Sequence, residues 1–294
     1  MLKKEVLSVK SYVALQALGD NLISLSLLSH LKGNVEIIGT KHTKNVANII
    51  DVNRFNISVL FDDIPGFYDI KNKGLLSAIK DIFKFRKFIK NNHINELVFE
   101  KKDFRVFLLT FGLKINIFSP IELTNVYLDR ARNIESAFHQ KIKVKNCIEQ
   151  HKNIRKILIS PVTRILEKNI THEDMGDLIN ILSHYDFTIV LVDYSNSYSV
   201  FRDQVDSYIT GTSLIDVKKL IIDCDAFIGP DSFLIHLAYF YGKFVYVIFN
   251  KYSVYFLPPG CEECKNFIIV SANISFKKYL ISSFKDIGLI EGKR

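Results

Sequence analysis

Short runs of apolar residues alternate along the chain with stretches in which apolar residues recur every three or four positions. The first pattern is typical of buried strands and the second of amphipathic helices. In the first half of the chain, the predicted elements cover residues 6–13, 21–31, 35–38, 46–50, 58–60, 75–91, 96–99, 104–111 and 115–117. Regular alternation of this kind predicts an α/β fold with parallel sheets and helices on both faces.

The pattern changes between residues 134 and 154, which are polar and contain no convincing buried strand. After this stretch the alternation restarts, with predicted elements at residues 156–160, 171–183, 187–192, 213–223, 226–229, 232–241, 244–249 and 276–284. A chain of 294 residues is long enough for two domains of ordinary size. We therefore predict two Rossmann-like domains, residues 1–150 and 151–294, with ligands at the carboxyl ends of their strands.

Composition limits the class of partner only weakly. Lys and Arg number 39 against 31 Asp and Glu, and the net charge of +8 is not gathered in a tail. This balance suits an anionic ligand, an anionic membrane surface or a nucleic acid. The chain has no Trp, no dense Arg cluster and no recognisable nucleic-acid module, so we expect no nucleic-acid partner. The basic helix at 75–91 is either a solvated face or a surface for anionic lipid.

The cysteines and the apolar segments bear on the cellular compartment. Of the four cysteines only Cys261 and Cys264 are close in sequence, and one such pair is half a zinc site at best. We interpret both as reduced thiols in a loop. The first residues resemble a strand more than a signal peptide, and the most apolar stretch, 106–120, is too short to span a bilayer. We therefore expect a cytoplasmic protein.

One segment of the second half combines a strand, a tight turn, a helix and another strand. Gly229 and Pro230 break the first strand, and Asp231 or Ser232 can cap the helix that follows. Gly242 suits the left-handed position that ends this helix. A helix start at the carboxyl end of a parallel strand offers N–H groups to a phosphate. The alternative is that Asp231 only caps the helix.

The same segment resembles a hallmark of bacterial family 9 glycosyltransferases, the lipopolysaccharide heptosyltransferases and their relatives. The hallmark reads D-[ST]-G-x-x-H-L-A and is followed by a Gly-Lys/Arg-Pro turn, and the chain has DSFLIHLA from Asp231 to Ala238, then Gly-Lys-Phe. It departs at Phe233, where the family usually has Gly, and at Phe244, where Pro is usual. Glycine there lets the backbone approach a diphosphate, so we expect Phe233 to reshape that pocket.

Two further stretches match the family in the expected order. Leu18-Gly19-Asp20 resembles its LGD element, although Ser26 stands where Pro usually follows. Lys168-Asn-Ile-Thr171 resembles its K-x-W-P element, with Thr171 in place of Pro as a candidate helix cap. The three stretches together span both halves of the chain.

The resemblance implies a GT-B fold, in which two Rossmann-like domains face each other across a cleft. The first domain would bind the acceptor and the second the nucleotide sugar, and the last helix, about 276–284, would pack back on the first domain. The implied reaction is inverting and needs no metal or other cofactor. It moves a sugar, heptose favoured, from a nucleoside-diphosphate donor such as ADP-heptose to a lipopolysaccharide core or other surface-glycan acceptor.

The resemblance also implies roles for individual residues and partners. Asp20, between Gly19 and Asn21 of the acceptor loop, would be the general base. The residues that would bind the donor are Lys168, Asp231, Ser232, His236, Thr163 and Arg164. The partners would be a nucleotide sugar and a glycolipid or oligosaccharide acceptor, with peripheral contact at the cytoplasmic face of the inner membrane.

Other interpretations remain open at this point. Asp20 could only cap the helix predicted to start at Asn21, Lys168 could be a solvated loop lysine, and His236 a buried helix residue. The donor could be a UDP- or GDP-hexose used in capsule or O-antigen synthesis. The chain could also be a degenerate member that binds a nucleotide or glycan without catalysis, although a scaffold has no need of the base.

Overall fold

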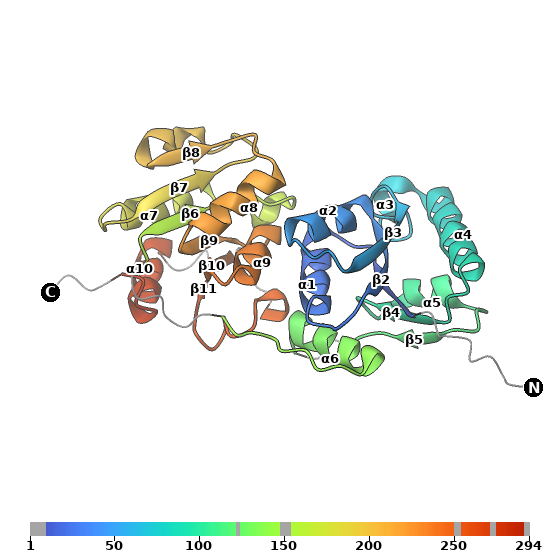
Figure 1. Ribbon diagram of the computed structural model, residues 1–294. Coiled ribbons are helices and arrows are strands. Elements are labelled where there is room, and N and C mark those ends of the chain that lie inside the picture. Colours follow the sequence, from blue (N-terminus) through green and yellow to red (C-terminus); the bar gives the residue numbers. More distant parts are fainter. Residues whose placement is uncertain (1–9, 122–123, 148–153, 250–253, 271–274, 291–294) are drawn as a thin grey trace, which may run out of the picture. The chain divides into compact units, whose positions relative to one another are not determined.

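The computed structural model describes residues 10–121, 124–147, 154–249, 254–270 and 275–290. The chain divides into two compact units, Met1–Val144 and Lys145–Arg294 (Figure 1). The predicted boundary, after residue 150, lies six residues beyond this division. Each unit contains one wholly parallel sheet, as the alternation of elements predicts.

The first unit has a five-stranded sheet with the strand order β3-β2-β1-β4-β5. Its strands are β1 (Lys10–Ala14), β2 (Val35–Thr40), β3 (Phe55–Phe61), β4 (Glu96–Phe99) and β5 (Asn116–Phe118). Its helices are α1 (Leu18–Leu28), α2 (Lys41–Ile49), α3 (Ile70–Lys73), α4 (Leu75–Asn91), α5 (Phe104–Thr110) and α6 (Val126–Phe138). Helix α1 contacts α2 and α6, whereas α4 contacts α3 and α5.

The second unit has a six-stranded sheet with the order β11-β10-β9-β6-β7-β8. Its strands are β6 (Lys156–Ile159), β7 (Thr188–Val192), β8 (Ser207–Ile209), β9 (Ala226–Pro230), β10 (Phe244–Phe249) and β11 (Phe267–Ile269). Its helices are α7 (His172–Leu182), α8 (Leu214–Asp223), α9 (Phe233–Phe240) and α10 (Phe276–Asp286), with 3-10 turns at Leu166–Lys168, Ser199–Gln204 and Val254–Phe256.

Short polar side chains define many of the helix starts. Five of them accept a hydrogen bond from a first-turn N–H group: Thr40, Asp103, Asn125, Thr171 and Ser213. The predicted cap at Thr171 is confirmed, because its Oγ1 accepts from the N–H of Asp174 at 3.1 Å. Gly242 ends α9 with φ of +68°, a left-handed conformation that few other residues adopt easily.

The order of strands places two switch points in the fold. In the first sheet β1 lies between β2 and β4, and in the second β6 lies between β9 and β7. At such a point the connections leave toward opposite sides and open a crevice at the carboxyl ends of the strands. The loops that follow β1, β6 and β9 carry the residues predicted to bind substrates.

The last helix packs within the second unit through its apolar residues. Its apolar residues Phe276, Leu280 and Phe284 are buried in the core of the second unit, where the Phe284 ring lies 4.9 Å from that of Tyr246. Helix α10 also contacts α7. These contacts of its apolar face lie within the second unit, and packing of the helix on the first domain stays a prediction.

The cysteines correct one expectation. Cys147 and Cys261 form a disulfide, with their Cα atoms 5.5 Å apart, whereas Cys264 is not part of it. The predicted reduced state of Cys261 is wrong, because folding brings together two residues that lie 114 positions apart. Within the described residues, no group of His, Cys, Asp and Glu is suited to a metal ion. None of the described helices is long and apolar enough to cross a bilayer.

Candidate active site

The first unit places Asp20 against a buried arginine. Asp20 lies in the first turn of α1, and its Oδ1 accepts from Nη2 of Arg130 at 2.6 Å. Nη1 of Arg130 donates to the Asp20 carbonyl at 2.8 Å and to Oγ of Ser24 at 3.0 Å. The Arg130 side chain on α6 is 4% exposed and that of Asp20 25%. The guanidinium therefore fixes the Asp20 carboxylate while leaving part of it at the surface.

This geometry excludes the simplest alternative for Asp20. Helix α1 begins at Leu18 and its N-cap is Ala17, which has no side chain able to cap it. Asp20 is consequently inside the helix and does not cap it. An acidic residue in the first turn is still stabilised by the helix dipole.

A second carboxylate lies behind this pair. Glu100, which directly follows β4, is buried, with Oε1 3.9 Å from Nη1 of Arg130. Burial raises the pKa of Glu100 to about 7, although the charge of Arg130 opposes the shift. Burial alone would lower the pKa of Arg130, but Asp20 and Glu100 outweigh it and hold the pKa above its ordinary range. The charge of this cluster therefore changes near neutral pH.

The neighbours of Asp20 have different surroundings. The Asn21 side chain is buried, and its Nδ2 donates to the carbonyl of Gln16 at 3.1 Å. It ties the loop after β1 to the start of α1. Gly19 is partly buried in the first turn of the helix. The role of Asn21 is therefore to hold the loop between β1 and α1 in place through its buried side chain.

The second unit brings together three of the predicted donor-binding residues. Nζ of Lys168 donates to Oδ2 of Asp231 at 2.6 Å, and Nε2 of His236 lies 3.7 Å from Oδ1 of the same carboxylate. The side chains of Asp231 and His236 are largely buried, whereas that of Lys168 is 32% exposed. The interpretation of Lys168 as a solvated loop lysine is therefore wrong.

Strand packing explains why these loops meet. Strands β6 and β9 are adjacent, and Lys168 follows the first while Asp231 follows the second. A Cβ added at Gly229, near the end of β9, would come within 2.7 Å of the Ser160 carbonyl oxygen. The absence of a side chain at Gly229 thus allows the two strand ends to approach closely.

The start of α9 lies beside this ion pair. Ser232 occupies the N-cap position, but its side chain makes no capping hydrogen bond. Ser232 is thus at the predicted cap position, but the predicted capping bond is not made. The Ser232 hydroxyl therefore accepts no hydrogen bond from the first-turn N–H groups of α9. A helix start whose N–H groups are not capped by a side chain can bind an anion.

The loop before Lys168 contains the two remaining predicted residues. Oγ1 of Thr163 donates to the Ile165 carbonyl at 2.7 Å, and the N–H of Thr163 donates to Oδ1 of Asn169 at 2.7 Å. Arg164 is exposed in the same loop. The Thr163 hydroxyl is thus engaged in shaping the loop, whereas the Arg164 side chain faces solvent.

Comparison with known proteins rests on the structure. No family model and no curated protein matches the chain in sequence. The Escherichia coli heptosyltransferase WaaC with ADP matches at a TM-score of 0.65, with 10% identity over 94% of this chain and 100% of that one. A family 9 glycosyl transferase of Veillonella parvula matches at 0.65, with 11% identity over 95% and 97%. The chain has the fold of bacterial heptosyltransferases.

The heptosyltransferase fold confirms the predicted pair of Rossmann-like domains. It does not by itself decide the reaction, because a UDP-GlcNAc 2-epimerase of Methanocaldococcus jannaschii also matches, at a TM-score of 0.54. That protein shares 12% identity, over 97% of this chain and 94% of its own.

Arg130 and Glu100 lie outside the set of residues predicted from the sequence. The resemblance to family 9 does not include them, and Arg130 is 110 positions from Asp20. One signal was available for Arg130, since it falls on the buried stripe of α6 with Val126, Ile134 and Ala137. A charged residue on such a stripe requires a buried partner.

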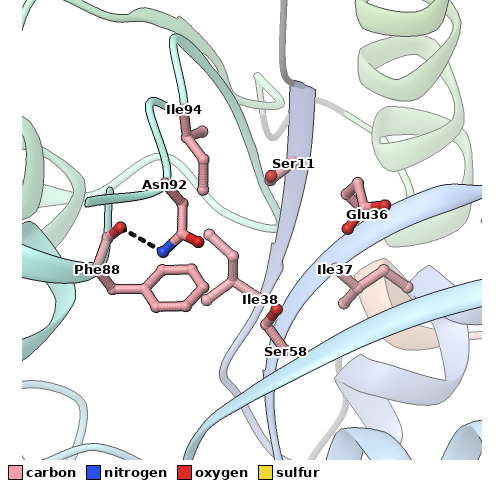
Figure 2. Close-up of a pocket in the computed structure, with 8 residues that line it drawn as sticks. All are labelled: Ser11, Glu36, Ile37, Ile38, Ser58, Phe88, Asn92 and Ile94. Atoms are coloured by element: carbon pink, nitrogen blue, oxygen red, sulfur yellow. Dashed lines mark hydrogen bonds between the residues drawn. The ribbon is translucent and has the colours of Figure 1, made fainter. Parts of the chain in front are cut away.

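A pocket of the first unit lies elsewhere (Figure 2). It is lined by Ser11, Glu36, Ile37, Ile38, Ser58, Phe88, Asn92 and Ile94. Ser11 and Glu36 lie near the amino ends of their strands, and Asn92 is held by a bond from its Nδ2 to the Phe88 carbonyl at 2.9 Å. In the heptosyltransferase fold, substrates are expected at the carboxyl ends, so this pocket is not the candidate site.

Proposed function

We propose that this chain is an inverting, metal-independent glycosyltransferase that transfers a sugar, heptose favoured, from ADP-heptose to a glycolipid or oligosaccharide acceptor. The observation that carries the proposal is the contact between Lys168 and Asp231 at the start of α9. Three sequence stretches and the heptosyltransferase fold support it. We assign acceptor activation to the first unit and donor binding to the second.

Asp20 is the residue we assign as general base. Arg130 engages Oδ1, so Oδ2 is the atom to accept the proton from the acceptor hydroxyl as that oxygen attacks the anomeric carbon. The base must be within hydrogen-bond reach of this hydroxyl, and its position then matters more than its basicity. Arg130 supplies that position, because its bonds to the Asp20 carbonyl and to Ser24 hold the guanidinium itself in place.

The leaving diphosphate gains negative charge as the glycosidic bond breaks. Lys168 and the first-turn N–H groups of α9 are the donors assigned to it, in the role that a metal ion has in other enzymes. Each hydrogen bond to a charged group contributes about 1.5–3 kcal/mol. The Lys168 ammonium has three N–H donors, so it can bond the diphosphate while it still contacts Asp231, and His236 lies near the other oxygen of that carboxylate.

One observation favours a hexose donor as a second candidate. Phe233 is the first residue of α9 and is half-buried beside the expected phosphate position. A ring at this position changes the approach of the backbone to the donor. A UDP- or GDP-hexose is the alternative that this substitution supports.

Calorimetric titration in chelator tests donor binding. We expect ADP to bind the purified chain more tightly than UDP, GDP or CMP, and Lys168→Ala to weaken that binding at least tenfold. Lys156→Ala is the matched control, because Lys156 is also paired with an aspartate, Asp223, and its side chain is 31% exposed. Preference for UDP or GDP would select the hexose donor, and no binding by any nucleotide would contradict the proposal.

A transfer assay tests the base. Asp20→Asn should retain nucleotide affinity and lose transfer to lipopolysaccharide core fragments by at least a hundredfold. Asp216→Asn, which changes an acidic residue in the first turn of α8, is the control expected to remain active. Near-normal turnover of Asp20→Asn would remove Asp20 from the mechanism, and restoration of activity by Mg²⁺ after chelation would contradict metal independence.

A further inference from the structure

Two neighbouring helices of the first unit expose large apolar side chains. Leu76, Ile79 and Phe83 project from α4, and Phe104, Phe107 and Phe111 from α5 and its end; their exposed fractions range from 42% to 84%. Single exposed apolar residues are ordinary, but a contiguous group marks a site of interaction. We refer to these six residues and the lysines beside them as the α4–α5 surface.

Both helices present this surface on the same side of the sheet. Their opposite sides bury Phe85 and Ile89 of α4 and Val106 and Leu109 of α5 in one core cluster. The helices contact each other, and Nη1 of Arg86 donates to the Leu108 carbonyl at 3.3 Å. Their neighbouring positions can be followed in Figure 1. The two exposed sides therefore form one surface directed away from the sheet.

The phenylalanines of α5 form a continuous ridge. Phe104, Phe107 and Phe111 recur at three- and four-residue spacing, with ring centroids 5.8 Å and 5.1 Å apart. These three side chains give α5 a second apolar face, which the described part of the chain leaves exposed. The ridge is a preformed surface that needs no rearrangement to enter an apolar medium.

Positive charge is concentrated around the ridge. Residues 70–114 contain eleven Lys and Arg against four Asp and Glu, a net charge of +7 within a chain of net charge +8. Lys80, Lys87 and Lys90 are exposed along α4 on the same side as Phe83. Of the four acidic residues, Glu100 is buried and Glu96 pairs with Lys10.

This combination selects the kind of partner. We propose that the α4–α5 surface docks on an anionic lipid bilayer, with the phenylalanines in the interface and the lysines at the headgroups. A second copy of the chain would bring the same positive charge against this one, which opposes self-association. The proposal concerns the surface alone and holds whichever sugar the enzyme transfers.

The location of the ridge connects it with the candidate base. Phe104 follows the buried Glu100 by four residues, and the Arg105 guanidinium lies 4.6 Å from the centre of the Tyr68 ring. Burial raises the pKa of Tyr68, and the nearby charges of Glu100 and Asp20 add to the shift. Docking at the ridge would thus bring a bilayer to the same unit that carries Asp20.

Sedimentation with lipid vesicles tests the proposal and requires neither sugar donor nor acceptor. The full chain should bind vesicles of phosphatidylethanolamine and phosphatidylglycerol at least tenfold more strongly than vesicles of phosphatidylcholine. Binding should weaken as salt increases, because the lysine contribution is screened. Equal binding to both vesicle types, or no binding to either, would overturn it.

Two sets of substitutions separate the apolar and charged contributions. The triple variants Phe104→Ser/Phe107→Ser/Phe111→Ser and Lys80→Gln/Lys87→Gln/Lys90→Gln should each lower the vesicle partition coefficient at least tenfold. Val200→Ser/Ile215→Ser is the control, since it removes exposed apolar residues from the second unit. All variants should keep the circular dichroism spectrum and melting temperature of the parent, because the changed side chains are exposed.

The results distinguish a lipid bilayer from a second copy of the chain as the partner of the α4–α5 surface. Unchanged vesicle binding in both triple variants would overturn the proposal. So would a dimer in sedimentation without lipid that the phenylalanine variant abolishes, since that result would assign the ridge to self-association. If the phenylalanine variant fails to fold, the lysine variant alone still provides the test.

Discussion

Glu100 and Arg130 carry opposite charges inside the first unit, and their balance depends on pH. The Glu100 pKa is raised from 4.5 to about 7 in the folded chain. Between these values the folded state holds a proton that the unfolded state has released. The free energy of unfolding therefore falls as pH rises through this window and stays constant above it.

Replacing Glu100 with Gln should remove this dependence. Relative to Glu100→Gln, the parent should lose up to about 3 kcal/mol of stability between pH 4.5 and 8. Urea unfolding of both proteins at pH 4.5, 6 and 8 measures the difference. A difference that does not change with pH would show that Glu100 titrates normally.

Arg130 is expected to tolerate no substitution, including Arg130→Lys. An ammonium cannot bridge the Asp20 carboxylate, the Asp20 carbonyl and Ser24 as the planar guanidinium does. Turnover should fall at least tenfold while nucleotide affinity remains unchanged. Arg132→Lys, on the exposed side of the same helix, is the control. Equal activity of the two variants would contradict a positioning role for Arg130.

Residue roles are predictable from sequence only where a local pattern contains them. Asp20, Lys168 and Asp231 lie in short stretches with recognisable spacing, and the structure pairs the last two. The partner of Asp20 is Arg130 in α6, and the second carboxylate near that arginine is Glu100, which follows β4. No local pattern relates residues that only the assembled sheet brings together.

At the scale of elements, the caps of α7 and α8 offer a matched pair. Oγ1 of Thr171 accepts from Asp174 N–H at 3.1 Å, and Oγ of Ser213 accepts from Asp216 N–H at 3.2 Å. Thr171→Ala and Ser213→Ala should each reduce the free energy of unfolding by about 1 kcal/mol. Only Thr171→Ala should also weaken nucleotide binding, because α7 directly follows the Lys168 loop.

Chemical denaturation and calorimetric titration of the two variants check this difference. If Thr171→Ala binds nucleotide as tightly as the parent does, the start of α7 is not connected with the donor site. A loss of affinity in Ser213→Ala as large as that in Thr171→Ala would instead indicate a general effect of stability.

Element boundaries follow the sequence closely where apolar periodicity is strong. Residues 75–91, 96–99 and 244–249 match α4, β4 and β10. The strands β8 and β11 are not predicted, whereas the equally short β5 is predicted at residues 115–117. The start of α1 is predicted three residues late, at Asn21, because Ala17 gives no capping signal.

At the scale of the whole molecule, the disulfide between Cys147 and Cys261 encloses most of the second unit. A cross-link over 114 residues restricts the unfolded chain and stabilises the fold by about 2–5 kcal/mol. The variant Cys147→Ser/Cys261→Ser should therefore unfold at lower urea concentration than the parent. Added dithiothreitol should remove the difference. Identical unfolding without reductant would show that the bond does not form.

The fold class is predictable because two runs of alternating strands and helices are compatible with few folds other than two parallel α/β domains. The reaction is less so, since heptosyltransferases and an epimerase both match this chain in structure. Folds position loops, and the residues of those loops decide the chemistry. Titration and transfer assays are therefore the tests that distinguish these functions.

In the proposed donor site, Asp231 competes with the diphosphate for the Lys168 ammonium. A diphosphate bound there would share the ammonium with a carboxylate already in place, so it would gain less than from an unpaired lysine. When the nucleotide departs, the ammonium would still be paired with Asp231. We therefore expect Asp231→Asn to bind a nucleoside diphosphate more tightly than the parent and to release it more slowly.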